Sequence, residues 1–166
     1  MAVWRVRSGA MGATQMLGVW STGSDFGSAD ASALTRAVIA MRGLLALPQR
    51  EARYYNAAVD SSGQPLDGRC QYRVTGGRIP ARWWSVTLYD PAGYLVRNDA
   101  GIYSVNGGSV GDPSAWTVLV SPQRQPGLWL PTGGIDRFEL TLRTYLPLGQ
   151  GLSAQQLPRI ERGGCK

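Results

Sequence analysis

The sequence predicts a mainly β protein, an antiparallel β-sandwich of jelly-roll type that carries one N-terminal helix. Three observations lead to this fold class. Most of the chain after residue 50 consists of short segments in which apolar and polar residues alternate, which is the period of a β-strand. Glycine (22 residues) and proline (10 residues) separate these segments, as expected of many strands joined by turns. Only one stretch has the period of an amphipathic helix, so the sequence lacks the βαβ alternation of a parallel-sheet fold.

The stretch with helical spacing is residues 28–47. Its apolar residues recur at intervals of four, three and four and so share one helix face: Leu34, Val38, Met41 and Leu45. Pro48 marks the end of this helix. We expect the apolar face to pack against a sheet, and the alternative is a helix that lies on a membrane surface. Residues 1–27 are rich in glycine and weakly patterned, so we expect an extended or irregular N-terminal segment there. At 166 residues the chain suits a single domain, which we place at 28–166.

Eight segments have the pattern of strands. They are residues 52–60, 69–76, 81–90, 94–99, 102–105, 116–121, 128–131 and 137–147. In the segment 81–90, alternation puts Trp84, Val86 and Leu88 on one face, which we expect to be core. The opposite face mixes rings with hydroxyl groups: Trp83, Ser85, Thr87 and Tyr89. This second face either packs beneath the N-terminal helix or contacts a ligand, and Arg82 is placed to stack on a neighbouring ring or to contact an anion.

The sequence contains no histidine, which excludes several kinds of chemistry. Ser-His-Asp and Cys-His catalysis both need an imidazole, and so does the usual proton shuttle near neutral pH. With only two cysteines, a tetrahedral Cys/His zinc site is also excluded. We therefore expect no metal and no cofactor, and any catalysis would have to use carboxylates or other polar side chains.

The net charge of +6 points to an anionic partner or to a solvated basic surface. The arginines are scattered along the chain and form no basic run longer than a pair. This distribution is not typical of a nucleic-acid-binding protein. An anionic membrane surface is the partner that suits it better.

The two cysteines, Cys70 and Cys165, lie almost a full domain apart. In an oxidising compartment they would form one disulfide that ties the C-terminal tail to a strand, and in a reducing one they would be two unrelated thiols. A bridge over so long a loop would stabilise the fold by about 4–5 kcal/mol in the chain-entropy model. The first twenty residues show neither a signal peptide nor a membrane span. We expect the bridge, and with it an export segment outside this sequence. The alternative is a cytosolic protein without the bridge.

Three aspartates are candidate carboxylates for catalysis: Asp60, Asp67 and Asp90. Each lies beside a glycine or proline turn, where aspartate commonly accepts hydrogen bonds from backbone amides. A glycosidase would instead need two carboxylates that face each other across a cleft. Their spacing in the sequence leaves both interpretations open.

Five ordered blocks of the sequence resemble a bacterial family known as domain of unknown function 1214. They are "RYYNAAVDSSGQPLDG", "CQYRVTGG", "RWWSVTLYD", "LWLPTGG" and "ELTLRTYLP", within residues 50–160. The resemblance implies a jelly-roll-like β-domain and, for short members, a place in the cell envelope, often behind a hydrophobic anchor that this sequence lacks before Trp20. It includes Trp129, Arg143 and Tyr145 in the family pattern, and it brings no established reaction with it.

Together these observations predict a non-catalytic module of the cell envelope, periplasmic or membrane-associated. We expect it to bind a ligand or an envelope protein through five residues, and one version of this role is an accessory subunit of a membrane-associated complex. The five residues are Arg82, Trp83, Trp129, Arg143 and Tyr145. The alternative is a carboxylate-dependent hydrolase that acts on envelope glycans or esters.

Overall fold

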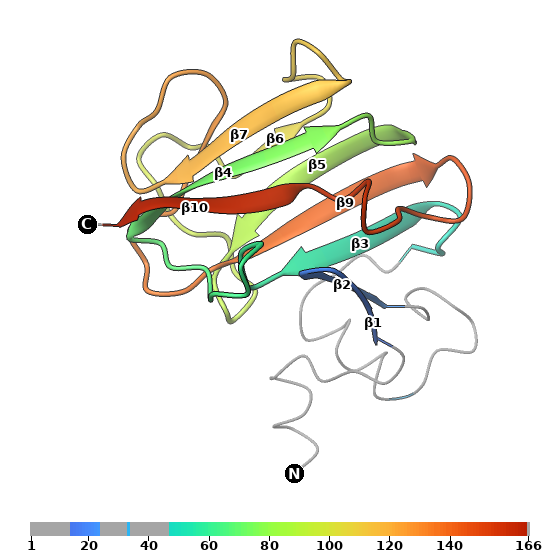
Figure 1. Cartoon of the computed structure of the whole chain (residues 1–166), viewed down its shortest axis with the longest axis horizontal. Helices are drawn as coiled ribbons and strands as arrows, with labels where there is room; N and C mark the ends of the chain where they lie inside the picture. The colour runs from blue at the N-terminus through green and yellow to red at the C-terminus, as the bar shows by residue number, and fades with distance from the viewer. Residues whose placement is uncertain (1–13, 24–32, 34–46, 166) are drawn as a thin grey trace.

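The structure, a computed structural model, describes residues 14–23, 33 and 47–165. These residues form ten strands in two sheets that face each other as a sandwich (Figure 1). The mainly β class predicted from the sequence is therefore confirmed. The predicted helix at 28–47 lies outside the described residues except at Ala33 and Leu47. Within the described part of the chain, no helix has the length and apolar character needed to cross a membrane.

The larger sheet has six strands in the order β1-β2-β3-β9-β5-β6. Their bounds are Thr14–Leu17 (β1), Trp20–Gly23 (β2), Ala52–Ala57 (β3), Glu139–Pro147 (β9), Ala81–Tyr89 (β5) and Ser104–Asn106 (β6). All its neighbouring strands are antiparallel. The two longest strands, β5 and β9, pair along their whole length, so they form the rigid centre of this sheet.

The smaller sheet has four strands in the order β10-β4-β7-β8. Their bounds are Arg159–Cys165 (β10), Cys70–Gly77 (β4), Ala115–Ser121 (β7) and Trp129–Pro131 (β8). The β7–β8 pair is parallel, whereas the other pairs are antiparallel. The prediction of an antiparallel sandwich therefore holds for every pair of described strands except this one, because the connection 122–128 brings the chain back alongside β7 before β8 begins.

The hydrophobic core fills the space between the two sheets. It follows from the alternation in the sequence, because the apolar positions of β9 and β5, and Phe138 just before β9, point inward and are buried: Phe138, Leu140, Leu142, Trp84, Val86 and Leu88. The facing strand β4 contributes Tyr72 and Val74, both fully buried. Trp84 stacks on Trp116 of β7 with the ring centroids 4.6 Å apart, which joins the two sheets. The predicted core face of residues 81–90 is therefore confirmed.

The expectation of extended or irregular chain over residues 1–27 can be compared only at residues 14–23, where the chain is extended but regular. These residues form the hairpin of β1 and β2, with Gly18 in the turn at a φ of +65°. The anchor is Trp20, which is 1% exposed and donates its Nε1–H to the Pro158 carbonyl at 2.8 Å. Two four-residue strands leave almost no periodic pattern, so a contact with a residue far along the chain decides the structure here.

Two further strand predictions need correction. Residues 94–99 form no strand, because the side chain of Asn98 bonds the backbone of Val96 and Ile102 and so holds this segment as a loop. Conversely, the sequence patterns do not predict β10. Only Ile160 is buried in it, and the remaining residues are charged, small or exposed, so the sequence "RIERGGC" shows no alternation.

The strand registers define two opposite ends of the sandwich. Cys70 lies opposite Cys165 at one end, which we call the disulfide end. Ala81 lies opposite Pro147 at the other end, which we call the Leu146 end. The disulfide end includes the connections 58–69, 90–103 and 132–138, whereas the Leu146 end includes 78–80, 107–114 and 148–158. In Figure 1 the disulfide end lies at the left, beside the C-terminus, and the Leu146 end lies at the right.

Candidate binding site

The outer face of the six-stranded sheet carries polar and aromatic side chains, and we call it the Arg143 face. The register places its residues in rows across β3, β9 and β5: Tyr145 with Trp83; Tyr54 with Arg143 and Ser85; Asn56 with Thr141 and Thr87; and finally Tyr89. The predicted grouping of Trp83, Ser85, Thr87 and Tyr89 on one face is thus confirmed. Ser85 and Thr87 are buried, so only part of this face is open to a ligand.

Arg143 is the centre of this face. Its guanidinium donates one hydrogen bond to the Thr87 hydroxyl at 3.2 Å and another to the Tyr89 hydroxyl at 2.6 Å. It also lies over two rings, 5.2 Å from the Tyr89 centroid and 5.9 Å from the Tyr54 centroid. These contacts fix the guanidinium in one orientation, with its charge against aromatic faces.

Trp83 and Tyr145 form the more accessible part of the Arg143 face. Their ring centroids are 5.3 Å apart and their planes are inclined by 59°. Trp83 is 42% exposed, whereas its chain neighbour Trp84 is 5% exposed. Arg82 is exposed beside Trp83, but the cation–π contacts among the described residues belong to Arg124, Arg143 and Arg162, so stacking of Arg82 is not observed.

Tyr54 borders this group from β3 and is 6% exposed. Burial raises the pKa of its phenol, the nearby Tyr145 raises it further, and the positive charge of Arg143 opposes this in part. The hydroxyl therefore stays protonated at neutral pH and serves as a hydrogen-bonding group rather than as a base. Sequence reasoning missed Tyr54 and the role of Tyr89 as a partner of Arg143, because pairing between β3, β9 and β5 is not visible before the register is known.

Trp129 does not join the Arg143 face. It begins β8 in the other sheet, where its Nε1–H points to the Ser121 carbonyl at 3.1 Å and to the Ser121 hydroxyl at 3.2 Å. Arg124 lies 5.9 Å from the centroid of its ring. The structure thus separates Trp129 from Trp83, Arg143 and Tyr145, and gives it local partners that anchor the connection between β7 and β8.

Asp60 is a buried carboxylate at the disulfide end. It accepts hydrogen bonds from the Ser62 hydroxyl at 2.6 Å and from the backbone amides of Ser62 and Gln64, each at 3.0 Å. Arg162 of β10 donates its Nε–H to the other carboxylate oxygen at 2.8 Å. Burial acts to raise the pKa of Asp60, but these hydrogen bonds together outweigh it and lower the pKa. Asp60 is therefore held ionised as a structural anchor between the turn and β10.

Asp67 and Asp90 also accept hydrogen bonds from their own turns. The side chain of Arg69 bonds both oxygens of Asp67, and chiefly this lowers the pKa of Asp67 to about 2. Asp90 accepts from the amides of Ala92 and Tyr94, both at 2.9 Å. The turn-forming interpretation thus describes all three aspartates. The carboxylates with lowered pKa stay ionised at neutral pH, whereas general-acid catalysis needs one that holds its proton.

A disulfide joins Cys70 and Cys165, as the sequence predicted for an oxidised protein. It lies where β4 and β10 pair, with the two Cα atoms 3.9 Å apart. It therefore fastens the last strand of the chain to the centre of the smaller sheet.

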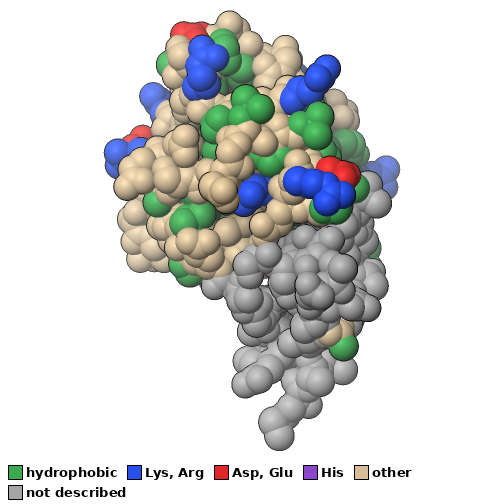
Figure 2. Space-filling view, turned by 90° about the vertical axis from the view of Figure 1, so that its right-hand side faces the viewer, with side chains coloured by type: hydrophobic (Ala, Val, Ile, Leu, Met, Phe, Trp, Pro, Cys, Tyr) green, Lys and Arg blue, Asp and Glu red, His purple; other side chains and the backbone are tan. Residues whose placement is uncertain are grey.

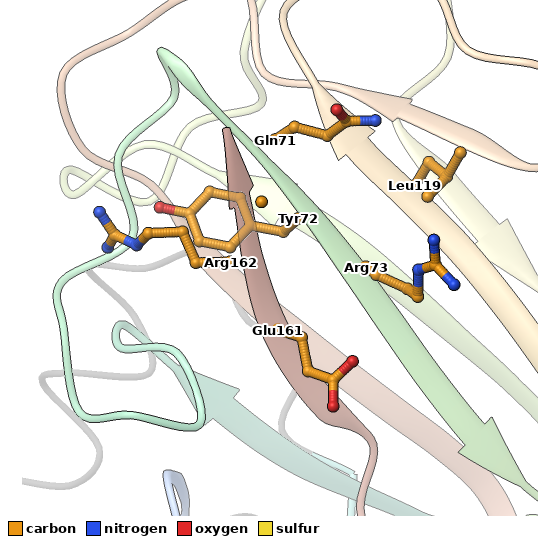
Figure 3. A pocket seen from close by; sticks show the side chains of 7 residues that line it. Gln71, Tyr72, Arg73, Leu119, Glu161 and Arg162 are labelled. Carbon is orange, nitrogen blue, oxygen red and sulfur yellow. The ribbon is translucent and has the colours of Figure 1, made fainter. Parts of the chain in front are cut away.

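A shallow hollow of about 260 Å³ lies on the outer face of the smaller sheet (Figure 3). Arg73, Leu119 and Glu161 share one row across β4, β7 and β10, and Gln71 and Gly163 lie beside them. Glycine at 163 leaves open the space that a side chain would occupy, next to the shift of register between Arg162 and Cys165. No cluster of three acidic, cysteine or histidine side chains that could hold a metal ion occurs within residues 14–23 and 47–165.

A family model described as "Protein of unknown function (DUF1214)" matches residues 51–149, which is more than half of the chain. No curated protein matches the chain. The matched region contains β3 to β9 and therefore the whole Arg143 face.

Two crystal structures are similar to this chain. The VPA0106 protein from Vibrio parahaemolyticus is 24% identical with a TM-score of 0.63, and the match covers 86% of this chain and 38% of that protein. A protein from Burkholderia cenocepacia is 21% identical with a TM-score of 0.46, over 70% of this chain and 30% of that protein. The chain thus spans well under half the length of either protein. The Vibrio structure supports the fold and nothing beyond it.

Proposed function

The chain belongs to the DUF1214 family, and from that premise we propose that it is a non-catalytic module of the cell envelope that binds a ligand or a protein partner. The observation that carries this proposal is the exposed Trp83 ring, inclined against Tyr145 beside the fixed guanidinium of Arg143. Aromatic side chains and arginine are the residue types that contribute most binding energy at interfaces. We place the contact there and leave Trp129 outside it.

The proposed contact is preorganised, because other residues hold its side chains in place before a partner binds. Arg143 is oriented by Thr87 and Tyr89, and these side chains belong to paired strands at the centre of the larger sheet. A partner that stacks on Trp83 would meet a guanidinium whose rotamer is already fixed, so little side-chain entropy is lost on binding. A sugar ring or another polar group with one apolar face would suit this combination of ring and cation.

The disulfide supports an oxidising compartment and hence the periplasm or another part of the envelope. We also propose that the sandwich is of jelly-roll type and that the module belongs to a larger membrane-associated complex. The lowered pKa values of Asp60 and Asp67 favour binding over carboxylate-dependent hydrolysis of glycans or esters.

Native mass spectrometry of the protein gently extracted from its source cells tests this function. We expect a mass above the 17.9 kDa of the chain, contributed by a bound ligand or partner. The extra mass should be lost in Trp83→Ala and retained in Tyr94→Ala, because Tyr94 is more exposed but lies at the disulfide end. A mass equal to that of the bare oxidised chain would contradict a stably bound ligand or partner. Retention of the extra mass in Trp83→Ala would show that the contact does not depend on Trp83.

A further inference from the structure

The Leu146 end exposes several large apolar side chains close together, and we call them the Leu146 patch: Trp83, Tyr145, Leu146 and Leu148. Trp83, Leu146 and Leu148 are 42%, 49% and 69% exposed. Trp83 and Tyr145 are in ring contact, and the amide of Leu148 donates to the Pro80 carbonyl at 2.8 Å. This bond holds the chain just after β9 against the segment before β5, so the four residues lie at one end of the sandwich.

Leu146 has an unusual backbone. Its φ is +46°, and it is the single non-glycine residue with positive φ among those the structure describes. A leucine in this left-handed region carries a steric cost. The side chain recovers little by packing, because about half of it remains exposed. A strained residue whose side chain faces solvent is a reason to look for a function in that side chain.

The charges at this end are mostly positive. Four exposed arginines (Arg50, Arg78, Arg82 and Arg159) lie here with three acidic residues (Glu51, Asp112 and Glu161), and Arg50–Glu51 and Arg159–Glu161 are exposed ion pairs, so Arg78 and Arg82 supply the excess positive charge. Figure 2 faces this end and shows arginine side chains beside apolar ones. Arg82 is exposed at the start of β5, at the same end of the sheet as Trp83. The ion pairs of the disulfide end are closer, with Asp60–Arg162 at 2.8 Å and Asp67–Arg69 at 2.6 Å.

We propose that the Leu146 patch is a membrane-docking surface, which inserts its leucines and aromatic rings into the headgroup region of an anionic bilayer. Tryptophan and tyrosine prefer that region because one part of each ring system is apolar and the other is polar. Leucines next to them supply apolar area to bury, and the neighbouring arginines add attraction to anionic lipid. The combination of rings, leucines and excess positive charge fits a bilayer better than an acidic protein, which would be held by the arginines without a need for the leucines.

This inference shares Trp83 and Tyr145 with the proposed contact, and it goes beyond the proposed function by assigning an anionic bilayer to Leu146 and Leu148. The test is co-sedimentation with vesicles of equal parts phosphatidylglycerol and phosphatidylcholine. We expect the full chain to bind them, to bind pure phosphatidylcholine vesicles roughly tenfold less, and to shift its tryptophan emission to the blue as Trp83 leaves water. The variant Leu146→Ser/Leu148→Ser should lose roughly tenfold or more in partitioning, because the area to be buried is gone.

The matched control is Tyr94→Ser/Leu95→Ser, which removes 72%- and 49%-exposed side chains from the disulfide end. It should bind the anionic vesicles within about twofold of the unchanged protein, because those residues lie away from the docking surface. Circular dichroism shows whether each variant is folded. Leu148→Asn alone, outside the left-handed position, repeats the test with less disturbance of the backbone.

Three outcomes would overturn the inference. One is failure of the unchanged protein to bind anionic vesicles, and another is an equal loss of binding in the two double variants. The third is binding that high salt abolishes but that is insensitive to the leucines, which would assign the surface to an acidic partner instead. If the protein carries an extra mass in native mass spectrometry but does not bind vesicles, the membrane inference is wrong and the proposed function still stands.

Discussion

The two ends of this sandwich both expose apolar side chains, but they differ in how the chain around those side chains is held. At the disulfide end, a covalent bridge, a buried ion pair and carboxylates bound to turn amides leave the polar groups paired with one another. At the Leu146 end no disulfide is present among the described residues, and the exposed Leu146 adopts a left-handed backbone, which no other described non-glycine residue does. The first arrangement stabilises the fold, whereas the second costs stability. We therefore expect substitutions at the disulfide end to lower the stability of the fold. Substitutions at the Leu146 end should instead weaken binding.

The largest effect should come from removal of the disulfide. Cys70→Ser together with Cys165→Ser frees a loop with a sequence separation of 95 residues. The free energy of unfolding should fall by about 4–5 kcal/mol in the chain-entropy model. Urea unfolding measures this free energy. The matched variant at the opposite end is Leu146→Ser/Leu148→Ser, whose free energy of unfolding should stay within about 1 kcal/mol of that of the unchanged protein. A loss below about 1 kcal/mol for the cysteine pair would mean that the disulfide end does not hold the fold.

Arg162→Met should have the next largest effect. It leaves Asp60, whose side chain is 1% exposed, buried without its cationic partner. We expect a loss of about 3 kcal/mol in the free energy of unfolding. Arg159→Met is the matched control on the same strand, because its ion pair with Glu161 is longer, at 3.9 Å, and exposed. That change should cost less than about 0.5 kcal/mol, and equal losses for the two variants would argue that the burial of Asp60 is unimportant.

A smaller effect should appear in acid. The pKa values of Asp60 and Asp67 are lower in the folded protein than in the unfolded chain. The folded state therefore binds fewer protons, and the stability from these groups is fully present above about pH 4 and lost as the pH falls toward about 2. Urea midpoints measured across this range should decline, and Arg162→Met should flatten the part of the decline that comes from Asp60. A midpoint that stays constant down to about pH 2 would contradict the assigned hydrogen bonds.

The smallest effect should be a gain in the free energy of unfolding rather than a loss. Asparagine tolerates the left-handed region better than leucine, so Leu146→Asn should raise the free energy of unfolding by about 0.5 kcal/mol. The same variant should bind anionic vesicles more weakly. Leu148→Asn, which does not lie at a positive φ, should weaken vesicle binding without the gain in stability. If Leu146→Asn destabilised the protein, Leu146 would be serving the fold rather than an interaction.

The sequence is informative where apolar and polar residues alternate over long strands. The segments at 81–90 and 137–147 are predicted as strands, and their inner faces form the core because Leu140, Leu142 and Val86 could not be left in water. The disulfide is predicted because the sequence has two cysteines and because we expect the protein in an oxidising compartment. The strands need no knowledge of distant contacts, and the disulfide, although it joins distant residues, is predictable because only two cysteines can pair.

The features that sequence reasoning missed depend on contacts between distant residues. Arg162 reaches Asp60 across 102 positions, and Trp20 reaches Pro158 across 138. The group of Tyr54, Tyr89 and Arg143 forms only when three strands align in register. No local pattern contains this information, which is why β10, the N-terminal hairpin and the partners of Arg143 escaped prediction. The left-handed backbone of Leu146 escaped as well, since leucine gives no local signal for it.

Hydrogen–deuterium exchange of the protein on anionic vesicles tests the division between the two ends most directly. We predict new protection of the amides of residues 81–83 and 145–149 when the protein is bound to phosphatidylglycerol-containing vesicles. We also predict unchanged exchange in the connections 58–69 and 90–103 at the disulfide end. Protection that appears at the disulfide end, or exchange that stays the same throughout the chain while the protein is bound, would contradict these predictions.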